Sequence, residues 1–319
     1  MTKLRTDQVT GQEVIVVPGR ASRPVTAIDR IAAEPSSNQA GDRSCPFCTG
    51  NETETPPEVF RIGEGKPDTP GWKVRVVPNL YPIVDDATGV TGAHEVVVLS
   101  PAHDTDFGGL TDAAAGAVLF TARERAKFHD QAGRAHTQIF INHGQLAGAS
   151  IAHPHAQIVT LDIIAPQVMA EVARYKAKKN VIGEDATDAA NHGGSITTKG
   201  QMRAWCPTGS ISSYLVRIAI NGSENDVAEL RFENTSDELI QDSAIILRDV
   251  LAALAKSIDA PNYNVVLHNP PARDPESSFM WWIEVIPRIS VLGGFELGSG
   301  IFVNTVDPAV AAAILRENL

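Results

Sequence analysis

The stretch GASIAHPHAQIV, residues 148–159, has two histidines and a glutamine at the alternate positions 153, 155 and 157. Because the side chains of a β-strand alternate between its two faces, this spacing predicts a strand that presents His153, His155 and Gln157 on one face. An imidazole can attack phosphorus, hold the transferred group as a phosphoramidate and release it again. His155 is therefore a candidate nucleophile, and a pair of partly buried histidines on a strand is the alternative interpretation.

A glycine-rich loop, NHGQLAGAS, comes directly before these histidines. Gly144, Gly148 and Ser150 give it the composition of a loop that turns backbone N–H groups toward an anion. Next to His155 and Gln157, the loop predicts a set of neutral donors at the place where the charge of a phosphate would develop.

Cys45 and Cys48 have the C-x-x-C spacing at which two thiolates bind one metal ion. His103, just after a predicted strand, and His153 are candidates for the other two ligands. Such a Cys2His2 set would hold one tetrahedral, structural zinc ion. A C-x-x-C without metal and a thioredoxin-like redox pair are the alternatives, although the sequence after Cys45 predicts a loop rather than the helix start that a redox pair requires.

Two further residues with phosphate-binding chemistry are Arg20 and Arg23, in the loop PGRASRP after the predicted strand EVIVV. Paired guanidinium groups suit bidentate contacts to phosphate. Solvated surface charge is the alternative interpretation.

Length and charge limit the classes of protein to consider. The 319 residues are enough for one large core or two modest ones, and the net charge of −11 argues against a nucleic-acid partner. No apolar run approaches the roughly 20 residues that span a bilayer, and the first residues lack the apolar centre of a signal peptide. We expect a cytoplasmic protein without a membrane partner, in agreement with its three cysteines.

Two parts of the chain repeat one pattern, which predicts a strand, a helix, a strand, a loop and a further strand. In the first part the elements are 94–100, 110–130, 136–144 and 153–161; in the second they are 213–220, 235–260, 263–269 and 280–287.

This repeat predicts a duplicated α+β unit, with a catalytic, zinc-binding half over 1–182 and a second half over 183–319 that lacks metal ligands. The polar segment 183–201 would bridge the halves, and Thr235 and Glu238 have capping-box spacing at the start of the second long helix. The second half has FMWWIE where the first has its two histidines.

Taken together, these motifs resemble those of the galactose-1-phosphate uridylyltransferase family, a branch of the histidine-triad superfamily. The resemblance covers nearly the whole chain, and its motifs occur in the family's order: TGQEVIVVPGRASRP, CPFC, VVPNLYP, HEVVVLSPAHD, NHGQLAGASIAHPHAQ and GGFELGSG. It implies a fold of duplicated histidine-triad-like units, with antiparallel sheets forming a half-barrel and helices packed outside.

The resemblance also implies a ping-pong transfer of a nucleoside monophosphate between a nucleotide sugar and a sugar 1-phosphate, through a covalent nucleotidyl-histidine at His155. It implies one structural zinc on Cys45, Cys48, His103 and His153. It implies that Gln157, Gly148 and Ser150 contact the phosphates of the substrate, and that Asn142 makes a further substrate contact. It implies that Asn79 contacts the ribose and that Arg20 and Arg23 lie in the phosphate region. It also implies that Glu296 contacts the hexose bound by the other subunit of a homodimer.

The chain departs from the family pattern in two places. Residues such as Met280 fill the positions of a second metal site that family members often carry, so we predict a single zinc ion. The stretch FELGSGIFVN resembles the ADP-glucose phosphorylase branch, so an enzyme that uses inorganic phosphate as acceptor is the alternative function. A nucleotide-binding protein without catalysis is a third hypothesis.

Overall fold

The computed structural model describes residues 2–18, 45–84, 90–221, 231–272 and 280–319. Arg20 and Arg23 lie outside these residues. Within them, no helix combines the length and the apolar character needed to cross a membrane.

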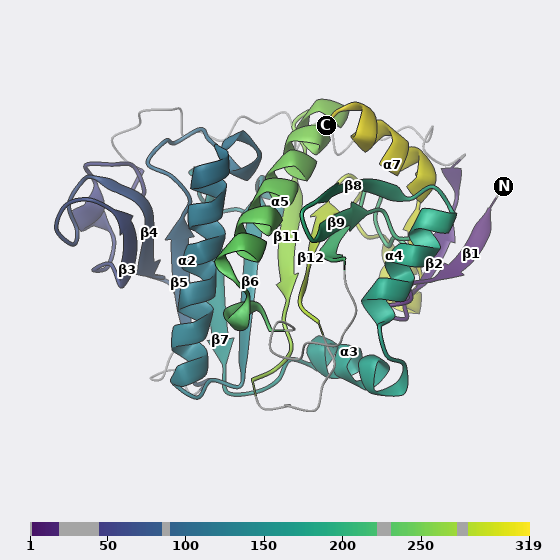
Figure 1. Ribbon diagram of the computed structural model, residues 1–319, viewed down its shortest axis with the longest axis horizontal. Helices are drawn as coiled ribbons and strands as arrows, with labels where there is room; N and C mark the ends of the chain where they lie inside the picture. The colour runs from purple at the N-terminus through teal and green to yellow at the C-terminus, as the bar shows by residue number, and fades with distance from the viewer. Residues whose placement is uncertain (1, 19–44, 85–89, 222–230, 273–279) are drawn as a thin grey trace.

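A ten-stranded antiparallel sheet runs through the whole molecule (Figure 1). Its edge strands are not paired with each other, so the sheet remains open in the described part of the chain. From one edge to the other, the strands are β3 (Phe60–Gly63), β4 (Trp72–Pro78), β5 (Gly92–Val98), β7 (His155–Leu161), β6 (His136–His143), β11 (Tyr263–His268), β12 (Trp282–Pro287), β10 (Val216–Ile220), β9 (Met202–Trp205) and β8 (Ser195–Lys199).

The strand order reads the same outward from the centre in both directions. On one side of the central pair it is β6, β7, β5, and on the other it is β11, β12, β10. The central pair is antiparallel, with Asn142 opposite Asn264. The two repeats predicted from the sequence therefore form two similar units that share one sheet, and the predicted α+β class is confirmed.

Two long helices, α2 (Asp112–Gln131) and α5 (Asp237–Ser257), lie side by side over one face of this sheet (Figure 1). Burying one large aliphatic side chain stabilises the fold by roughly 1.5–3 kcal/mol, and both helices contribute many. Their apolar side chains meet those of the sheet around one small apolar pocket, whose lining includes Val118, Leu119, Ala122, Leu247, Ile139, Ile141, Ala156, Val265, Leu267 and Ile283.

The N-termini of both helices are capped by hydroxyl groups. Thr111 accepts a hydrogen bond from the N–H of Ala114, and Ser236 accepts one from the N–H of Leu239. The cap of α5 is therefore Ser236 rather than Thr235, and the predicted pairing with Glu238 is off by one residue. Thr235 instead hydrogen-bonds to the carbonyl of Arg231.

Strand alternation places a second set of side chains on the opposite face. Over the strands of the second half, helices α3 (Pro166–Ala177) and α4 (Val181–Asn191) cover this face. Glu171 of α3 hydrogen-bonds to His268 of β11, and Asp185 of α4 hydrogen-bonds to Arg217 of β10. In the first half, Ala156 faces α2 and α5, so His155 and Gln157 lie on the face away from these helices.

The polar segment 183–201, expected as a bridge, contains most of α4 and all of β8. Its helix forms because Ile182, Ala186 and Ala189 recur at helical spacing and are buried, although the surrounding residues are polar. The boundary predicted at residue 182 lies inside α4, and the division into 1–182 and 183–319 stays a prediction.

The remaining elements lie at the edges of this framework. They are a three-stranded sheet of β1 (Lys3–Thr6), β2 (Glu13–Val16) and β13 (Phe302–Asn304), the helices α6 (Gly294–Ser299) and α7 (Pro308–Glu317), and the single turns η2 (Glu52–Glu54), η3 (Phe107–Gly109), η4 (Gln145–Ala147) and η6 (Phe232–Asn234).

Candidate active site and metal centre

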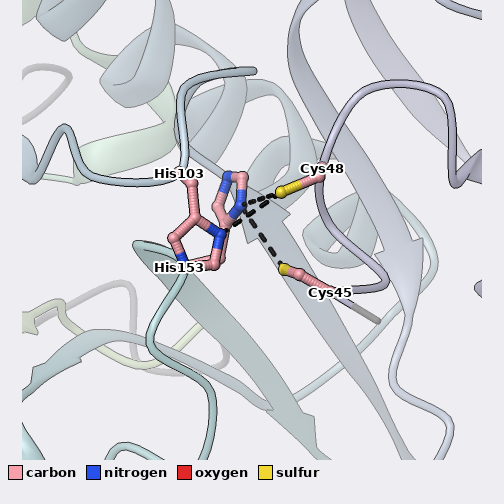
Figure 2. A group of neighbouring side chains, drawn as sticks. All are labelled: Cys45, Cys48, His103 and His153. Atoms are coloured by element: carbon pink, nitrogen blue, oxygen red, sulfur yellow. Dashed lines mark hydrogen bonds between the residues drawn. The ribbon is translucent and has the colours of Figure 1, made fainter. Parts of the chain in front are cut away.

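Four side chains from three separate segments converge beside the start of β7 (Figure 2). Cys45 and Cys48 come from one turn, His103 follows β5, and His153 precedes β7. Their ligand atoms all lie within 4.8 Å of one another, and among the described residues this is the one such group of histidine, cysteine and carboxylate side chains. The four ligands predicted from the sequence are thus brought together.

The distances fit a tetrahedral metal ion. The Sγ atom of Cys48 lies 3.2 Å from Nδ1 of His103, and both sulfurs lie 3.7 Å from Nδ1 of His153. A zinc ion with bonds of about 2.3 Å to sulfur and about 2.0 Å to nitrogen would separate these atoms by about 3.5 Å. The group could therefore hold a metal ion, and a thiolate and imidazole set suits zinc.

Hydrogen bonds outside the group hold His153 and the cysteine turn in place. The Nε2–H of His153 donates to the carbonyl of Ser100 at 2.9 Å, which leaves the lone pair of Nδ1 pointing at the two sulfurs. Burial lowers the pKa of His153, so its ring stays neutral as a ligand must. The amide of Asn51 donates to the carbonyl of Cys45 at 2.8 Å and holds the cysteine turn. This turn is not the start of a helix, which disfavours the redox interpretation.

His155 has a defined tautomer. Its Nδ1 donates to the backbone carbonyl of His153 at 2.9 Å, so the lone pair of the ring lies on Nε2. The side chain is buried, and burial lowers its pKa and favours the neutral form. Phe47, between the two cysteines, packs edge-on against this ring with the centroids 5.4 Å apart. A neutral imidazole with a free and oriented nitrogen can act as a nucleophile.

A cavity of about 310 Å³ lies in front of His155. Its walls come from the end of β6, the loop before β7 and the turn η3, and they include Asn142, His143, Gln145, Ala149, Ser150, Asp106 and Tyr263. Ser150 and Asn142, both predicted as substrate contacts, thus line the same cavity as the candidate nucleophile.

The glycines of the predicted anion loop are required by its backbone. Gly144 has φ +83° and Gly148 has φ +86°, a region that L-residues with a side chain rarely adopt. A Cβ atom on Gly144 would also lie 2.1 Å from the amide oxygen of Asn262. Gly148 itself does not line the cavity, and it ends η4 so that Ala149 and Ser150 reach the cavity wall.

Asn142 is oriented by a residue of the second half. Asn264, directly opposite it on β11, donates from Nδ2 to Oδ1 of Asn142 at 2.8 Å and to the carbonyl of Ala147 at 2.8 Å. These bonds leave the amino group of the Asn142 side chain for another acceptor. The second half therefore supports both the cavity wall and the anion loop.

Gln157 and Asn79 are not among the residues that line the cavity, and both lie next to a histidine for which the sequence predicts no role. His94 of β5 lies 2.8 Å from Oε1 of Gln157 and 3.1 Å from Nδ2 of Asn79. His94 reaches Gln157 because β5 pairs with β7 in a register that puts His94 opposite Val159, two residues from Gln157. This register cannot be derived from one sequence.

The sequence likewise assigns no role to His143, which lines the cavity. Its ring stacks on Tyr263 at 4.6 Å, and its Nε2 lies 3.9 Å from Oδ2 of Asp106. Burial lowers the pKa of His143, while the Asp106 carboxylate opposes that shift.

Glu296 lies apart from this cavity. It is part of α6, in an exposed segment, and its Oε2 accepts a hydrogen bond from the backbone N–H of Gly293 at 2.9 Å. Glu296 is not among the residues that line the cavity, so its contact with a hexose stays a prediction.

The fold and this site define the class of protein. The chain belongs to the family described as a domain of unknown function, DUF4921, whose model matches residues 2–107 and 108–319. It is an enzyme of the nucleotidyltransferase type with the fold of the galactose-1-phosphate uridylyltransferase family.

Among its relatives is the ADP-glucose phosphorylase of Arabidopsis thaliana, which is 30% identical over 337 residues, 99% of this chain and 92% of the relative. The crystal structure of an ADP-glucose phosphorylase from that plant with bound ADP-glucose superimposes with a TM-score of 0.83, at 28% identity and over 99% of both chains. A galactose-1-phosphate uridylyltransferase of Cryptococcus neoformans var. neoformans serotype D is 25% identical over 361 residues, 99% of this chain and 90% of the relative.

Proposed function

We propose that the chain is a nucleotide-sugar phosphorylase of the ADP-glucose type. The observation that carries the proposal is a neutral His155, with its lone pair on Nε2, at the wall of a cavity that Ala149 and Ser150 of the anion loop also line. The 30% identity to an ADP-glucose phosphorylase over nearly the full length of both chains supports adenosine and inorganic phosphate over the uridylyltransferase reaction.

In the first half-reaction, Nε2 of His155 attacks the α-phosphorus of the nucleotide sugar. A P–N bond forms, the P–O bond to the β-phosphate breaks, and the sugar 1-phosphate leaves with the electron pair. The imidazole becomes positively charged, and the carbonyl of His153, which accepts from Nδ1–H at 2.9 Å, stabilises that charge.

In the second half-reaction, an oxygen of inorganic phosphate attacks the same phosphorus. A P–O bond forms, the P–N bond breaks, and the electron pair returns to Nε2. The products are a nucleoside diphosphate and the free enzyme. Gln157, Ser150 and the side-chain amino group of Asn142 would donate to the phosphate oxygens, with Arg20 and Arg23 in the phosphate region and Asn79 at the ribose.

We further propose that the metal ion is zinc and that it is structural. Four protein ligands leave no position for water, and the ion would fix His153, whose carbonyl orients the nucleophile. Glu296 would reach the hexose from the second subunit of a homodimer, because α6 does not line the cavity of its own chain.

The test measures products and exchange. With ADP-glucose and phosphate, ³¹P NMR should detect ADP and glucose 1-phosphate, and labelled glucose 1-phosphate should exchange into ADP-glucose when phosphate is left out. Exchange without ADP formation, together with transfer from UDP-glucose to galactose 1-phosphate, would replace the proposal with the uridylyltransferase function. No exchange with any nucleotide sugar would overturn both.

A further inference from the structure

His94 lies on the same face of the sheet as Gln157. In the pairing of β5 with β7, Val96 is opposite Gln157 and His94 is opposite Val159. Since residues two apart in a strand share a face, His94 is a diagonal neighbour of Gln157 on the face that carries His155. Its side chain is buried, with 7% of its surface exposed.

The backbone fixes the tautomer of His94. The N–H of Ile83 donates to Nδ1 of the ring at 3.2 Å, so the ring hydrogen lies on Nε2. That hydrogen points to Oε1 of Gln157, 2.8 Å away. Burial lowers the pKa of His94, which keeps the ring neutral and preserves this arrangement.

A glutamine amide can present either its oxygen or its amino group, and the two orientations have nearly the same shape. If the oxygen faced a substrate phosphate, two acceptors would meet and repel each other. Because His94 binds Oε1, the amino group of Gln157 is left to donate to a phosphate oxygen. A loss of His94 would free the amide to rotate.

The loop that carries Asn79 is attached to the same histidine. The N–H of Asn79 donates to the backbone carbonyl of His94 at 2.8 Å, and Oδ1 of Asn79 accepts from the N–H of Tyr81 at 2.8 Å. Nδ2 of Asn79 lies 3.1 Å from Nε2 of His94, but both atoms carry hydrogen in this tautomer, so this contact is not a hydrogen bond and the backbone bonds hold the loop. His94 thus contacts both residues assigned to the phosphate and ribose of the nucleotide.

We propose that His94 is a positioning residue, which sets the amide of Gln157 with its amino group toward the transferred phosphate. This inference rests on the proposed function, because it gives Gln157 a donor role in nucleotidyl transfer.

The test is a double-mutant cycle on the rate of the first half-reaction, measured as adduct formation in a single turnover with ADP-glucose. The variants are His94→Phe, which keeps a ring without hydrogen bonds, Gln157→Leu, and the double variant. Removing one donor to a developing oxyanion costs about 10²–10³-fold, so we expect that loss for Gln157→Leu and about 10–100-fold for His94→Phe. The double variant should be no slower than Gln157→Leu alone. His94→Gln, which retains a donor, should recover much of the rate and controls for a fold lost in His94→Phe.

A wild-type rate in His94→Phe would overturn the inference, as would a further loss of the same factor when His94→Phe is added to Gln157→Leu. If the wild-type chain forms no adduct at all, the proposed function fails instead. The inference then depends on ¹⁵N NMR of histidine-labelled protein, with His94→Gln for assignment. The spectrum should show His94 protonated on Nε2, and protonation on Nδ1 would contradict the proposal.

Discussion

The two halves of the molecule have the same strand order but differ on the face away from α2 and α5. Beside the central pair, β7 of the first half carries His155 and Gln157, and β12 of the second carries Trp282 and Glu284 with the same spacing. In the first half, this face borders a cavity.

In the second half, the same face is filled by packed side chains. The ring of His268 stacks on Trp282 at 3.7 Å, and Glu284 accepts from the Nε of a fully buried Arg217 at 3.1 Å. Arg217 also binds Asp7 and Asp185, so its charge is compensated by three carboxylates. The comparison indicates that one framework can build a reactive face or a structural one, depending on which side chains the alternate strand positions carry.

The largest effect on turnover should come from His155, whose counterpart on β12 of the second half is Trp282. We expect His155→Ala to lower turnover by about 10⁴-fold or more, because the variant lacks the imidazole that forms the intermediate. Trp282→His in the same background should restore nothing, since its face is covered. A stopped assay for nucleoside diphosphate measures both, with the exposed His192→Ala as the control. Activity in the double variant would refute the asymmetry of the halves.

The metal group is the second difference between the halves. We expect one zinc ion per chain by elemental analysis, and Cys48→Ser should lose it together with about 3–5 kcal/mol of stability, a fall in Tm of roughly 10 °C. Cys206→Ala is the matched control, since this cysteine is buried away from the group and should leave the metal content unchanged. Full zinc content in Cys48→Ser would contradict the assignment.

A smaller effect should come from the contact that crosses between the halves. Asn264→Leu removes the donor to Asn142 and to the anion loop, and we expect a loss of about tenfold in kcat/KM. Single-turnover and steady-state kinetics measure it. Asn264→Asp, which keeps the shape but reverses the donor, should be at least as slow. A variant with unchanged kinetics would show that the second half does not position the site.

The smallest effect should be on stability, and it concerns His268 on the packed face of the second half. Burial disfavours a charged His268, but the Glu171 and Glu284 carboxylates outweigh it and raise the pKa of His268 above its ordinary value. A raised folded-state pKa gives stability that is complete below about pH 6.5 and is lost as the pH rises through the folded value.

His268→Gln should therefore cost about 1–2 kcal/mol of unfolding free energy at pH 6 and less at pH 9. Urea unfolding at both pH values measures this difference, and His192→Gln should show none of it. An equal cost at both values would mean that His268 is neutral in the folded state.

The sequence predicted those parts of the site that depend on local spacing. The alternation of HPHAQ placed His155 and Gln157 on one face, and a C-x-x-C with two histidines is specific enough to predict four ligands meeting at one point. The duplicated order of strands and helices was visible because each helix and strand has its own periodicity.

What could not be predicted depends on pairing between distant strands. His94 reaches Gln157 only through the register of β5 on β7, and Asn264 reaches Asn142 only through the pairing of the two halves. The residues that fill the second face also come from separate elements, with Asp7, Asp185 and Arg217 far apart in the chain. Hydrophobic patterns predict elements, but they do not predict which polar side chains meet.

The central claim is that His155 carries the nucleotide, and intact-protein mass spectrometry tests it most directly. The chain is mixed with ADP-glucose, UDP-glucose or UDP-galactose, without phosphate, beside His155→Ala. We expect an acid-labile adduct of one adenylyl group from ADP-glucose that is absent in the variant. A folded, zinc-loaded wild-type chain without an adduct from any donor, or an adduct that persists in His155→Ala, would contradict it.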